Sequence, residues 1–286
     1  VLPMAKMLMG KSVADSLYQA VDQRTQGLLY GPTLLAIGSN NPQWTQYVNS
    51  LANSCVAHNV ILQPFFVTDN YTDVASDKEQ IRAAIKGFAP DGILIEQPLP
   101  QSAAELVELI PAEADIDCCT NAMIADLYRG GEGYRPATAQ AVLAMLDYYG
   151  IDLAGKRMVI VGRGNAVGKP LAFMALGRNA TVTICHSKTE NLAEVCRSAD
   201  VLVSATGKPG LITADFVTEN SVVIDVGLSF VGGKTCGDVA KDVYAKCAAV
   251  SPVPGGIGPV TRAVLLYNLT KNYTRPDQDS SGEEIL

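Results

Sequence analysis

A glycine-rich loop in the second half of the chain constrains the fold more than any other feature of the sequence. The loop reads GRGNAVG over residues 162–168, and it lies between the apolar run RMVIV and the largely apolar run KPLAFMALG. Glycines between a strand and a helix let the backbone approach a phosphate, and the helix amino terminus adds unpaired N–H groups. The spacing is one residue longer than the usual dinucleotide fingerprint, so a tight structural turn is the alternative for this loop taken alone.

The segments around this loop alternate between predicted strands and predicted helices. Buried strands are predicted over residues 31–39, 91–100, 199–207 and 220–229. The last two are nearly continuous in apolar residues, which is typical of parallel strands covered on both faces. Helices are predicted over residues 76–88, 102–110, 135–150 and 261–273, the first of them beginning with Ser76 and Glu79 at capping-box spacing. The predicted fold class is therefore α/β.

Composition narrows the classes of protein that the chain can belong to. Its 286 residues suffice for two modest domains, and 48% of them are apolar, so a sizeable core can form. The net charge of −7 argues against a nucleic-acid-binding protein, and no apolar run reaches the roughly 20 residues that a bilayer crossing needs. Seven cysteines without a CxxC pair, and only two histidines, predict reduced thiols in a cytoplasmic protein and no metal site.

The residues that follow the next strand predict which dinucleotide the loop would bind. An NAD site usually ends this strand with an acidic residue that binds the ribose hydroxyls. Here TVTIC is followed by His186, Ser187 and Lys188, so no carboxylate is present to repel a 2′-phosphate. Arg163 could bind that phosphate through its planar fork of donors, helped by Ser187 and Lys188. We therefore expect NADP rather than NAD; the alternative is that these are solvated loop residues.

Several motifs together resemble one known family. The sequence contains GRGNAVGKP, CHSKT, VIDVG, GDV and, at residues 251–261, SPVPGGIGPVT. These motifs are similar to those of the bifunctional methylenetetrahydrofolate dehydrogenase/cyclohydrolase family, and the likeness runs almost end to end. The resemblance implies an amino-terminal α/β folate domain over residues 1–135, joined by a carboxy-terminal helix over residues 262–286. It also implies a Rossmann-type NADP-binding domain with a parallel sheet over residues 136–261, a tetrahydrofolate derivative as substrate, and a homodimer.

The resemblance is incomplete in the folate half. The family's helix motif Ser-x-x-Tyr-Val-x-x-Lys falls on Trp44, Tyr47 and Leu51, so only the tyrosine is kept. In the family's Val-Gln-Leu-Pro-Leu-Pro motif, the glutamine position holds Glu96. The family's Lys-Asp-Val-Asp-Gly motif keeps its second aspartate, which binds the pterin ring in the family, as Asp117, while its glycine is replaced by Cys118. The cofactor half is intact and the folate half is altered.

The resemblance assigns expected roles to named residues. The expected catalytic residues are Tyr47, Glu96 and Asp117, with Leu51 at the position of the family lysine. The expected substrate-binding residues are Tyr47, Gln97, Pro98, Asp117, Pro254, Gly255 and Gly256. The expected cofactor-binding residues are Gly162, Arg163, Gly164, Val167, Gly168, His186, Ser187 and Thr261. The alternative role of Thr261 is to cap the last helix. Asp225 and Asp238 are expected to be structural, and for Asp225 the alternative is a contact on the nicotinamide side.

The altered residues affect the family's two reactions differently. Hydride transfer from methylenetetrahydrofolate to NADP mainly needs two ligands held face to face, whereas hydrolysis of the methenyl product needs proton transfers. Leu51 can neither donate nor accept a proton. It also leaves Glu96 without a cationic partner, so either desolvation disfavours the charge of this carboxylate or the carboxylate faces water or a cationic substrate. We therefore expect an NADP-dependent dehydrogenase with weak or absent cyclohydrolase activity. The alternatives are an oxidoreductase acting on another pterin-like substrate and a catalytically silent nucleotide-binding paralogue.

Overall fold

The computed structural model describes residues 4–271 and 273 of the chain, which form two compact units. Of the described residues, the larger unit combines Ala122–Val264 with residues 4–16, and the smaller unit combines Leu17–Asn121 with residues 265–271 and 273. Helices α1 (Gly10–Thr25) and α8 (Ile257–Lys271) each contribute residues to both units. Whether the functional domains divide at residues 135 and 261 stays a prediction.

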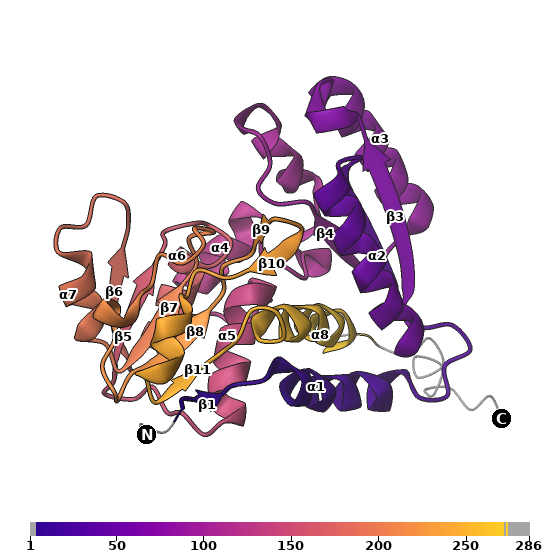
Figure 1. The fold of residues 1–286 in the computed structure, drawn as a ribbon. Helices are drawn as coiled ribbons and strands as arrows, with labels where there is room; N and C mark the ends of the chain where they lie inside the picture. The colour runs from indigo at the N-terminus through magenta and orange to yellow at the C-terminus, as the bar shows by residue number, and fades with distance from the viewer. Residues whose placement is uncertain (1–3, 272, 274–286) are drawn as a thin grey trace. The chain divides into compact units, whose positions relative to one another are not determined.

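The larger unit is built on a parallel sheet of strand order β1-β11-β8-β7-β5-β6 (Figure 1). Its strands are β1 (Lys6–Met7), β5 (Arg157–Val161), β6 (Thr181–Cys185), β7 (Val201–Ser204), β8 (Val222–Asp225) and β11 (Ala249–Val250). Every pairing in it is parallel, and β7 is buried along its whole length. The near-continuous apolar runs of the sequence therefore form central strands, as predicted, because both faces of such a sheet are covered.

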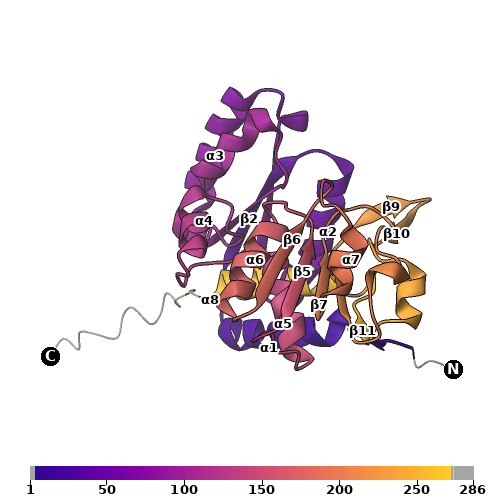
Figure 2. The same ribbon diagram turned by 90° about the vertical axis from the view of Figure 1, so that its left-hand side faces the viewer.

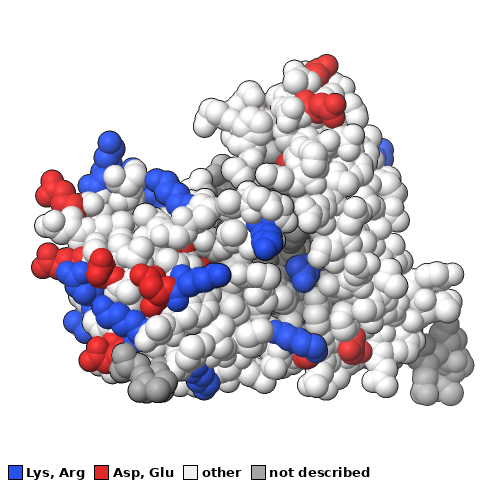
Figure 3. All heavy atoms as spheres, viewed as in Figure 1, with Lys and Arg blue, Asp and Glu red and all other residues white. Residues whose placement is uncertain are grey.

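Helices and short connections surround this sheet. The helices are α4 (Asn121–Tyr128), α5 (Ala137–Tyr148), α6 (Gly168–Gly177) and α7 (Leu192–Arg197), with short 3₁₀ turns at η4 (Ala214–Phe216) and η5 (Lys241–Ala245). Helix α6 packs against β5 and β6 (Figure 2). An antiparallel hairpin, β9 (Ser229–Val231) with β10 (Lys234–Cys236), extends the connection after β8. Basic and acidic side chains are interspersed on the face shown in Figure 3.

The smaller unit has a three-stranded parallel sheet in the order β3-β2-β4. Its strands are β2 (Thr33–Ser39), β3 (Ile61–Val67) and β4 (Gly92–Ile95), and its helical segments are α2 (Pro42–Ala57), η1 (Asp69–Tyr71), α3 (Val74–Phe88), η2 (Gln101–Leu109) and η3 (Ala112–Ala114). Helices α2 and α3 pack against β3 (Figure 1). The core joins the inner residues of β2 and β4, such as Ile37 and Ile95, to Ile81 of α3 and Leu106 of η2.

Three predictions of local structure were wrong. Helix α3 begins at Val74 because Asp73 caps it, accepting a hydrogen bond of 3.0 Å from the Ser76 backbone N–H, so Ser76 lies inside the helix. The predicted helix over residues 102–110 is the 3₁₀ segment η2. Helix α8 begins at Ile257, so Thr261 lies in its second turn, where its hydroxyl donates to the Ile257 carbonyl instead of capping the helix.

Candidate cofactor and substrate sites

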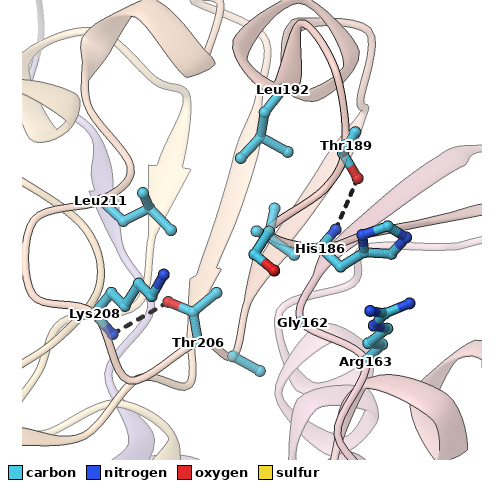
Figure 4. A pocket seen from close by; sticks show the side chains of 11 residues that line it. Gly162, Arg163, His186, Thr189, Leu192, Thr206, Lys208 and Leu211 are labelled. Atoms are coloured by element: carbon cyan, nitrogen blue, oxygen red, sulfur yellow. Dashed lines mark hydrogen bonds between the residues drawn. The ribbon is translucent and has the colours of Figure 1, made fainter.

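A cavity of about 510 Å³ opens at the carboxyl ends of three neighbouring strands of the larger unit (Figure 4). Strands β5, β6 and β7 end at Val161, Cys185 and Ser204. The residues that line the cavity are Val161, Gly162, Arg163, His186, Ser187, Thr189, Leu192, Ala205, Thr206, Lys208 and Leu211. Ligands of open parallel α/β sheets bind at this edge, so the cavity lies where such a fold places a nucleotide.

The glycine loop is shaped for close backbone approach. Gly162 has φ +123°, and a Cβ atom there would lie 2.4 Å from the Ala205 carbonyl oxygen. A Cβ atom on Gly168, the first residue of α6, would lie 2.0 Å from the carbonyl oxygen of Gly162. Both positions therefore require glycine, and the loop delivers the amino terminus of α6 directly after the strand. This is the strand–loop–helix arrangement that the sequence predicted.

The charges on the cavity wall favour an anionic ligand. Among the described residues that line it, Arg163 and Lys208 are basic and none is acidic. The His186 backbone N–H donates to the Thr189 hydroxyl at 2.8 Å, and its ring Nδ1 accepts from the Lys188 backbone N–H at 3.2 Å. Because Nδ1 is an acceptor in this geometry, the second ring nitrogen carries the proton and can donate to a ligand. This donor set fits a phosphate group.

Four of the eight predicted cofactor residues line this cavity: Gly162, Arg163, His186 and Ser187. Gly164, Val167 and Gly168 belong to the same loop and helix start but do not line it, and Thr261 lies in α8. The other lining residues were not predicted from the sequence: Val161, Thr189, Leu192, Ala205, Thr206, Lys208 and Leu211. One signal could have found part of this set: Ala205, Thr206 and Lys208 lie at the end of a predicted buried strand or just after it, and parallel neighbours end at the same edge.

The two buried aspartates of the larger unit have structural partners, as predicted. Asp225 is 1% exposed and accepts hydrogen bonds from the backbone N–H groups of Gly227, Asp238 and Val239. Burial raises the pKa of Asp225 to about 6. Asp238 in turn accepts from Ser204 and from Thr206, which lines the cavity. The loop that carries the GDV motif is therefore tied to the end of β7.

In the smaller unit, Glu96 lies at the centre of a hydrogen-bond cluster where strands β2 and β4 end. Its Oε2 accepts from the Ser39 backbone N–H at 2.7 Å, from the Ser39 hydroxyl at 3.0 Å and from the Tyr71 hydroxyl at 3.0 Å. Its Oε1 accepts from the side-chain amide of Asn41. Neutral donors from residues 39–41 and from Tyr71 therefore surround this half-buried carboxylate, and whether it also faces water or a cationic substrate stays a prediction.

The donors around Glu96 are fixed in that role. Tyr71 is 4% exposed, and burial together with the Glu96 charge raises the pKa of its hydroxyl, so it stays protonated. Asn41 uses its other side-chain atom, the carbonyl oxygen, to cap α2 by accepting from the Trp44 backbone N–H at 2.8 Å. Glu96 is thus connected through Asn41 to the start of the helix that carries Tyr47.

Substitution of Glu96 tests this cluster. Glu96→Ala leaves the Ser39 N–H, the Tyr71 hydroxyl and the Asn41 amide without their acceptor, so we expect the free energy of unfolding to fall by about 1–3 kcal/mol. Glu96→Gln, which keeps one acceptor oxygen, should lower the free energy of unfolding by less. Urea unfolding followed by circular dichroism measures both. An unchanged midpoint for Glu96→Ala would show that the cluster does not stabilise the unit.

The residues of α2 at the family motif positions differ in burial and packing. Trp44 is buried, stacks on Tyr47 with ring centroids 5.7 Å apart, and lies against Gly38, where a Cβ atom would come within 2.1 Å of the indole nitrogen. Tyr47 is half-buried, whereas Leu51 is fully buried at 0% exposure. At the family lysine position, the chain therefore has an aliphatic side chain packed in the core.

The segment that carries Asp117 is held from several sides. Asp115, at 0% exposure, accepts from the backbone N–H and hydroxyl of Thr120, both at 2.8 Å, and from the backbone N–H of Cys119 at 3.0 Å. The Asn268 side chain in α8 donates to the Ile116 carbonyl at 2.9 Å, and Asp115 forms an isolated bridge with Ile93 of β4. These contacts fix the backbone on both sides of Asp117, which is itself half-buried.

The other predicted substrate residues lie in two loops. Gln97 and Pro98 are exposed, follow β4 and are joined by a cis peptide bond. Pro254, Gly255 and Gly256 precede α8 and belong to the larger unit; the Gly255 carbonyl accepts from the Gly10 backbone N–H at 2.8 Å. Tyr47, Gln97, Pro98 and Asp117 belong to the smaller unit. The role of each in substrate binding stays a prediction.

The parallel sheet, the glycine loop and the basic cavity define a dinucleotide-binding α/β protein. Comparison with known proteins agrees: residues 136–277 match the family described as tetrahydrofolate dehydrogenase/cyclohydrolase, NAD(P)-binding domain. The chain is also 38% identical over 278 residues to the bifunctional protein FolD of Clostridium perfringens strain SM101, covering 94% of this chain and 99% of that protein. The chain belongs to the tetrahydrofolate dehydrogenase/cyclohydrolase family.

Solved structures of relatives have the same fold. The bifunctional FolD methylenetetrahydrofolate dehydrogenase/cyclohydrolase from Campylobacter jejuni is 33% identical, with a TM-score of 0.86 over 93% of this chain and 98% of that chain. The Trypanosoma brucei N5,N10-methylenetetrahydrofolate dehydrogenase-cyclohydrolase, complexed with NADP cofactor and inhibitor, is 28% identical, with a TM-score of 0.85 over 93% and 96% of the two chains. The predicted family and two-domain α/β fold are confirmed.

The described residues contain neither a membrane-spanning helix nor a cluster of metal ligands. None of the described helices combines the length and apolar content that a bilayer crossing requires. Over residues 4–271 and 273, no group of three or more His, Cys, Asp and Glu side chains is arranged to hold a metal ion. All seven cysteines lie in the described part of the chain and are free thiols there.

Proposed function

We propose that this chain oxidises 5,10-methylenetetrahydrofolate to 5,10-methenyltetrahydrofolate with NADP as the hydride acceptor. The observation that carries this proposal is the cavity at the ends of β5, β6 and β7, in a chain of this family. That cavity is lined by Arg163, His186 and Ser187 and by no acidic residue among those described. A 2′-phosphate fits such a wall, whereas NAD sites usually present a carboxylate there.

The chain's own residues bind and orient the two ligands. Bound NADP supplies a nicotinamide ring that accepts hydride. The glycine loop and the amino terminus of α6 fit its pyrophosphate, and Arg163 and Ser187 fit its 2′-phosphate. In the smaller unit, Asp117 is assigned to the pterin ring and Tyr47 to the substrate, as the family resemblance implies. Hydride transfer needs these ligands held in register, and holding them supplies much of the rate enhancement.

The second family reaction, hydrolysis of the methenyl product, is proposed to be weak or absent. The lysine position holds Leu51, which is fully buried and has no ionisable group. Glu96 accepts hydrogen bonds from Ser39, Asn41 and Tyr71, so most of its acceptor capacity serves the fold. A reaction that depends on proton transfer loses more from these features than a hydride transfer does.

A parallel assay tests the proposed function directly. The purified full chain is mixed with methylenetetrahydrofolate and either NADP or NAD, and formation of the reduced dinucleotide is followed by absorbance. We expect turnover that is faster with NADP than with NAD. Dinucleotide binding without turnover on any folate would support the silent paralogue instead. Turnover only with a different pterin would indicate another oxidoreductase.

We also propose that the chain forms a homodimer through the larger unit. Strand β6 lies at the end of the sheet order, and Ile184 on it is 38% exposed. On α4 and α6, Tyr128 (70% exposed) makes an edge contact with Phe173 (40% exposed), and Leu176 is 53% exposed. An apolar surface beside an open strand edge suits a second copy of the same chain.

A cytoplasmic location stays a prediction.

A further inference from the structure

The wall of the cavity opposite Arg163 and His186 carries Thr206 and Lys208 (Figure 4). Neither residue was predicted from the sequence, and neither belongs to the strand–loop–helix fingerprint. Both follow β7, and the Lys208 backbone N–H donates to the Thr206 hydroxyl oxygen at 3.2 Å. The two side chains therefore form one local unit, which presents a hydroxyl and an ammonium group to the cavity.

A buried carboxylate fixes the direction in which the Thr206 hydroxyl can bond. Asp238, at 1% exposure, accepts from the Thr206 backbone N–H at 2.7 Å and from its hydroxyl at 2.9 Å through the same oxygen. The hydroxyl proton is thus directed away from the cavity, and one lone pair is taken by the Lys208 N–H. What remains on this oxygen is a single lone pair, so toward a ligand Thr206 acts as an acceptor.

The loop behind Thr206 is itself held in place. The Asp238 backbone N–H donates to Asp225, and the Asp238 carbonyl accepts from the Ile212 backbone N–H at 3.0 Å. The Ala240 N–H donates back to the Ile212 carbonyl at 2.8 Å. The GDV loop and the 206–212 segment are therefore tied at both ends, which gives the Thr206 oxygen a fixed position in the cavity wall.

From this geometry we propose that Thr206 and Lys208 form a second contact surface for the dinucleotide, with Asp238 as its positioning residue. An acceptor oxygen beside a cation fits a ligand that offers a hydroxyl and a phosphate oxygen together, which is the chemistry of a ribose phosphate. NAD and NADP share these groups, so the Thr206–Lys208 surface binds both, whereas Arg163 and Ser187 distinguish them. This inference rests on the proposed dinucleotide site and extends it.

Calorimetric titration of the full chain with NADP and with NAD tests the proposal. Thr206→Val, which keeps the side-chain size but removes the hydroxyl, is expected to raise the Kd for both dinucleotides about tenfold. Lys208→Met should also raise the Kd for both dinucleotides, because it removes the ammonium group from the cavity wall. It should leave stability nearly unchanged, because this exposed ammonium has no partner among the described side-chain contacts. Asp238→Asn should raise the Kd for both dinucleotides as Thr206→Val does, although residue 238 does not line the cavity.

Matched variants separate binding from folding. Thr206→Ser keeps the hydroxyl and should restore Kd to within about twofold of the wild type. Arg163→Gln should weaken NADP only. Thermal unfolding of each variant reports stability independently of Kd. Values of Kd for Thr206→Val and Lys208→Met within twofold of the wild type, or a change confined to NADP, would overturn the inference. If the wild-type chain binds neither dinucleotide, the proposed function itself fails.

Discussion

Hydrolysis of 5,10-methenyltetrahydrofolate by this chain is expected to be about 10²–10⁴-fold slower than hydrolysis by a relative that keeps the helix lysine. The reason is Leu51, which is fully buried and has no group that can transfer a proton. Glu96 is not expected to replace the lysine, because its Oε2 already accepts three hydrogen bonds and its Oε1 accepts one from Asn41. Loss of methenyl absorbance, corrected for the buffer rate, measures this activity.

Two substitutions at residue 51 sharpen the test. Leu51→Lys restores an ionisable group and should raise hydrolysis where the ammonium reaches the substrate, but burying that charge should also lower the unfolding temperature. Leu51→Met conserves volume and should leave both activities and stability close to the wild type, within about 1.5 kcal/mol. The hypothesis is wrong if the wild-type chain hydrolyses the methenyl compound as fast as a lysine-bearing relative.

Much of the larger unit could be predicted because its signals are local. A strand, a glycine loop and a helix are adjacent in the sequence. The close approach that requires Gly168 is made within that same loop, whereas the one at Gly162 is made to Ala205 after the neighbouring strand β7. The near-continuous apolar strands allow little besides a covered parallel sheet. Half of the predicted cofactor residues line the cavity for this reason, since they directly follow β5 and β6.

The surroundings of Glu96 could not be predicted, because they depend on strand order. Ser39 ends β2, Asn41 precedes α2 and Tyr71 follows β3, and these segments meet Glu96 because β2 lies between β3 and β4. Nothing in the sequence states that order. Thr206 was missed for the same reason: its partner Asp238 lies 32 residues further along, and neither residue has a motif that indicates the other. Long-range polar partners are what a single sequence leaves open.

The start of α3 shows a different limit, which is competition between adjacent signals. Asp73 and Ser76 can each cap a helix, and Ser76 has the added support of Glu79 at capping-box spacing. In the structure Asp73 caps α3, and its carboxylate accepts from the Ser76 backbone N–H. Asp77, in the first turn of this helix, is fully buried, and its carboxylate accepts from the backbone N–H and the hydroxyl of Thr68, which follows β3. Tertiary contacts therefore decided between two caps of similar strength.

Asp115→Ala is expected to lower the free energy of unfolding by at least about 3 kcal/mol and to weaken folate binding at the same time. Its buried carboxylate accepts from the Cys119 N–H and from the N–H and hydroxyl of Thr120, and each donor left unpaired in the interior costs about 1–3 kcal/mol. The Cys119 thiol also donates to it at 3.3 Å, and burial together with Asp115 raises the pKa of that thiol, so it remains a donor.

Two further variants distinguish the effect of Asp115→Ala on stability from its effect on folate binding. Asp117→Asn changes the residue assigned to the pterin ring and should reduce folate affinity, and its urea midpoint is measured in parallel. Asp115→Asn keeps one acceptor oxygen and should fall between the wild type and Asp115→Ala in stability. Titration with tetrahydrofolate and urea unfolding measure the two quantities independently. If Asp115→Ala binds folate as the wild type does, the backbone around Asp117 is held without this carboxylate, and Asn268 and the bridge to Ile93 are sufficient.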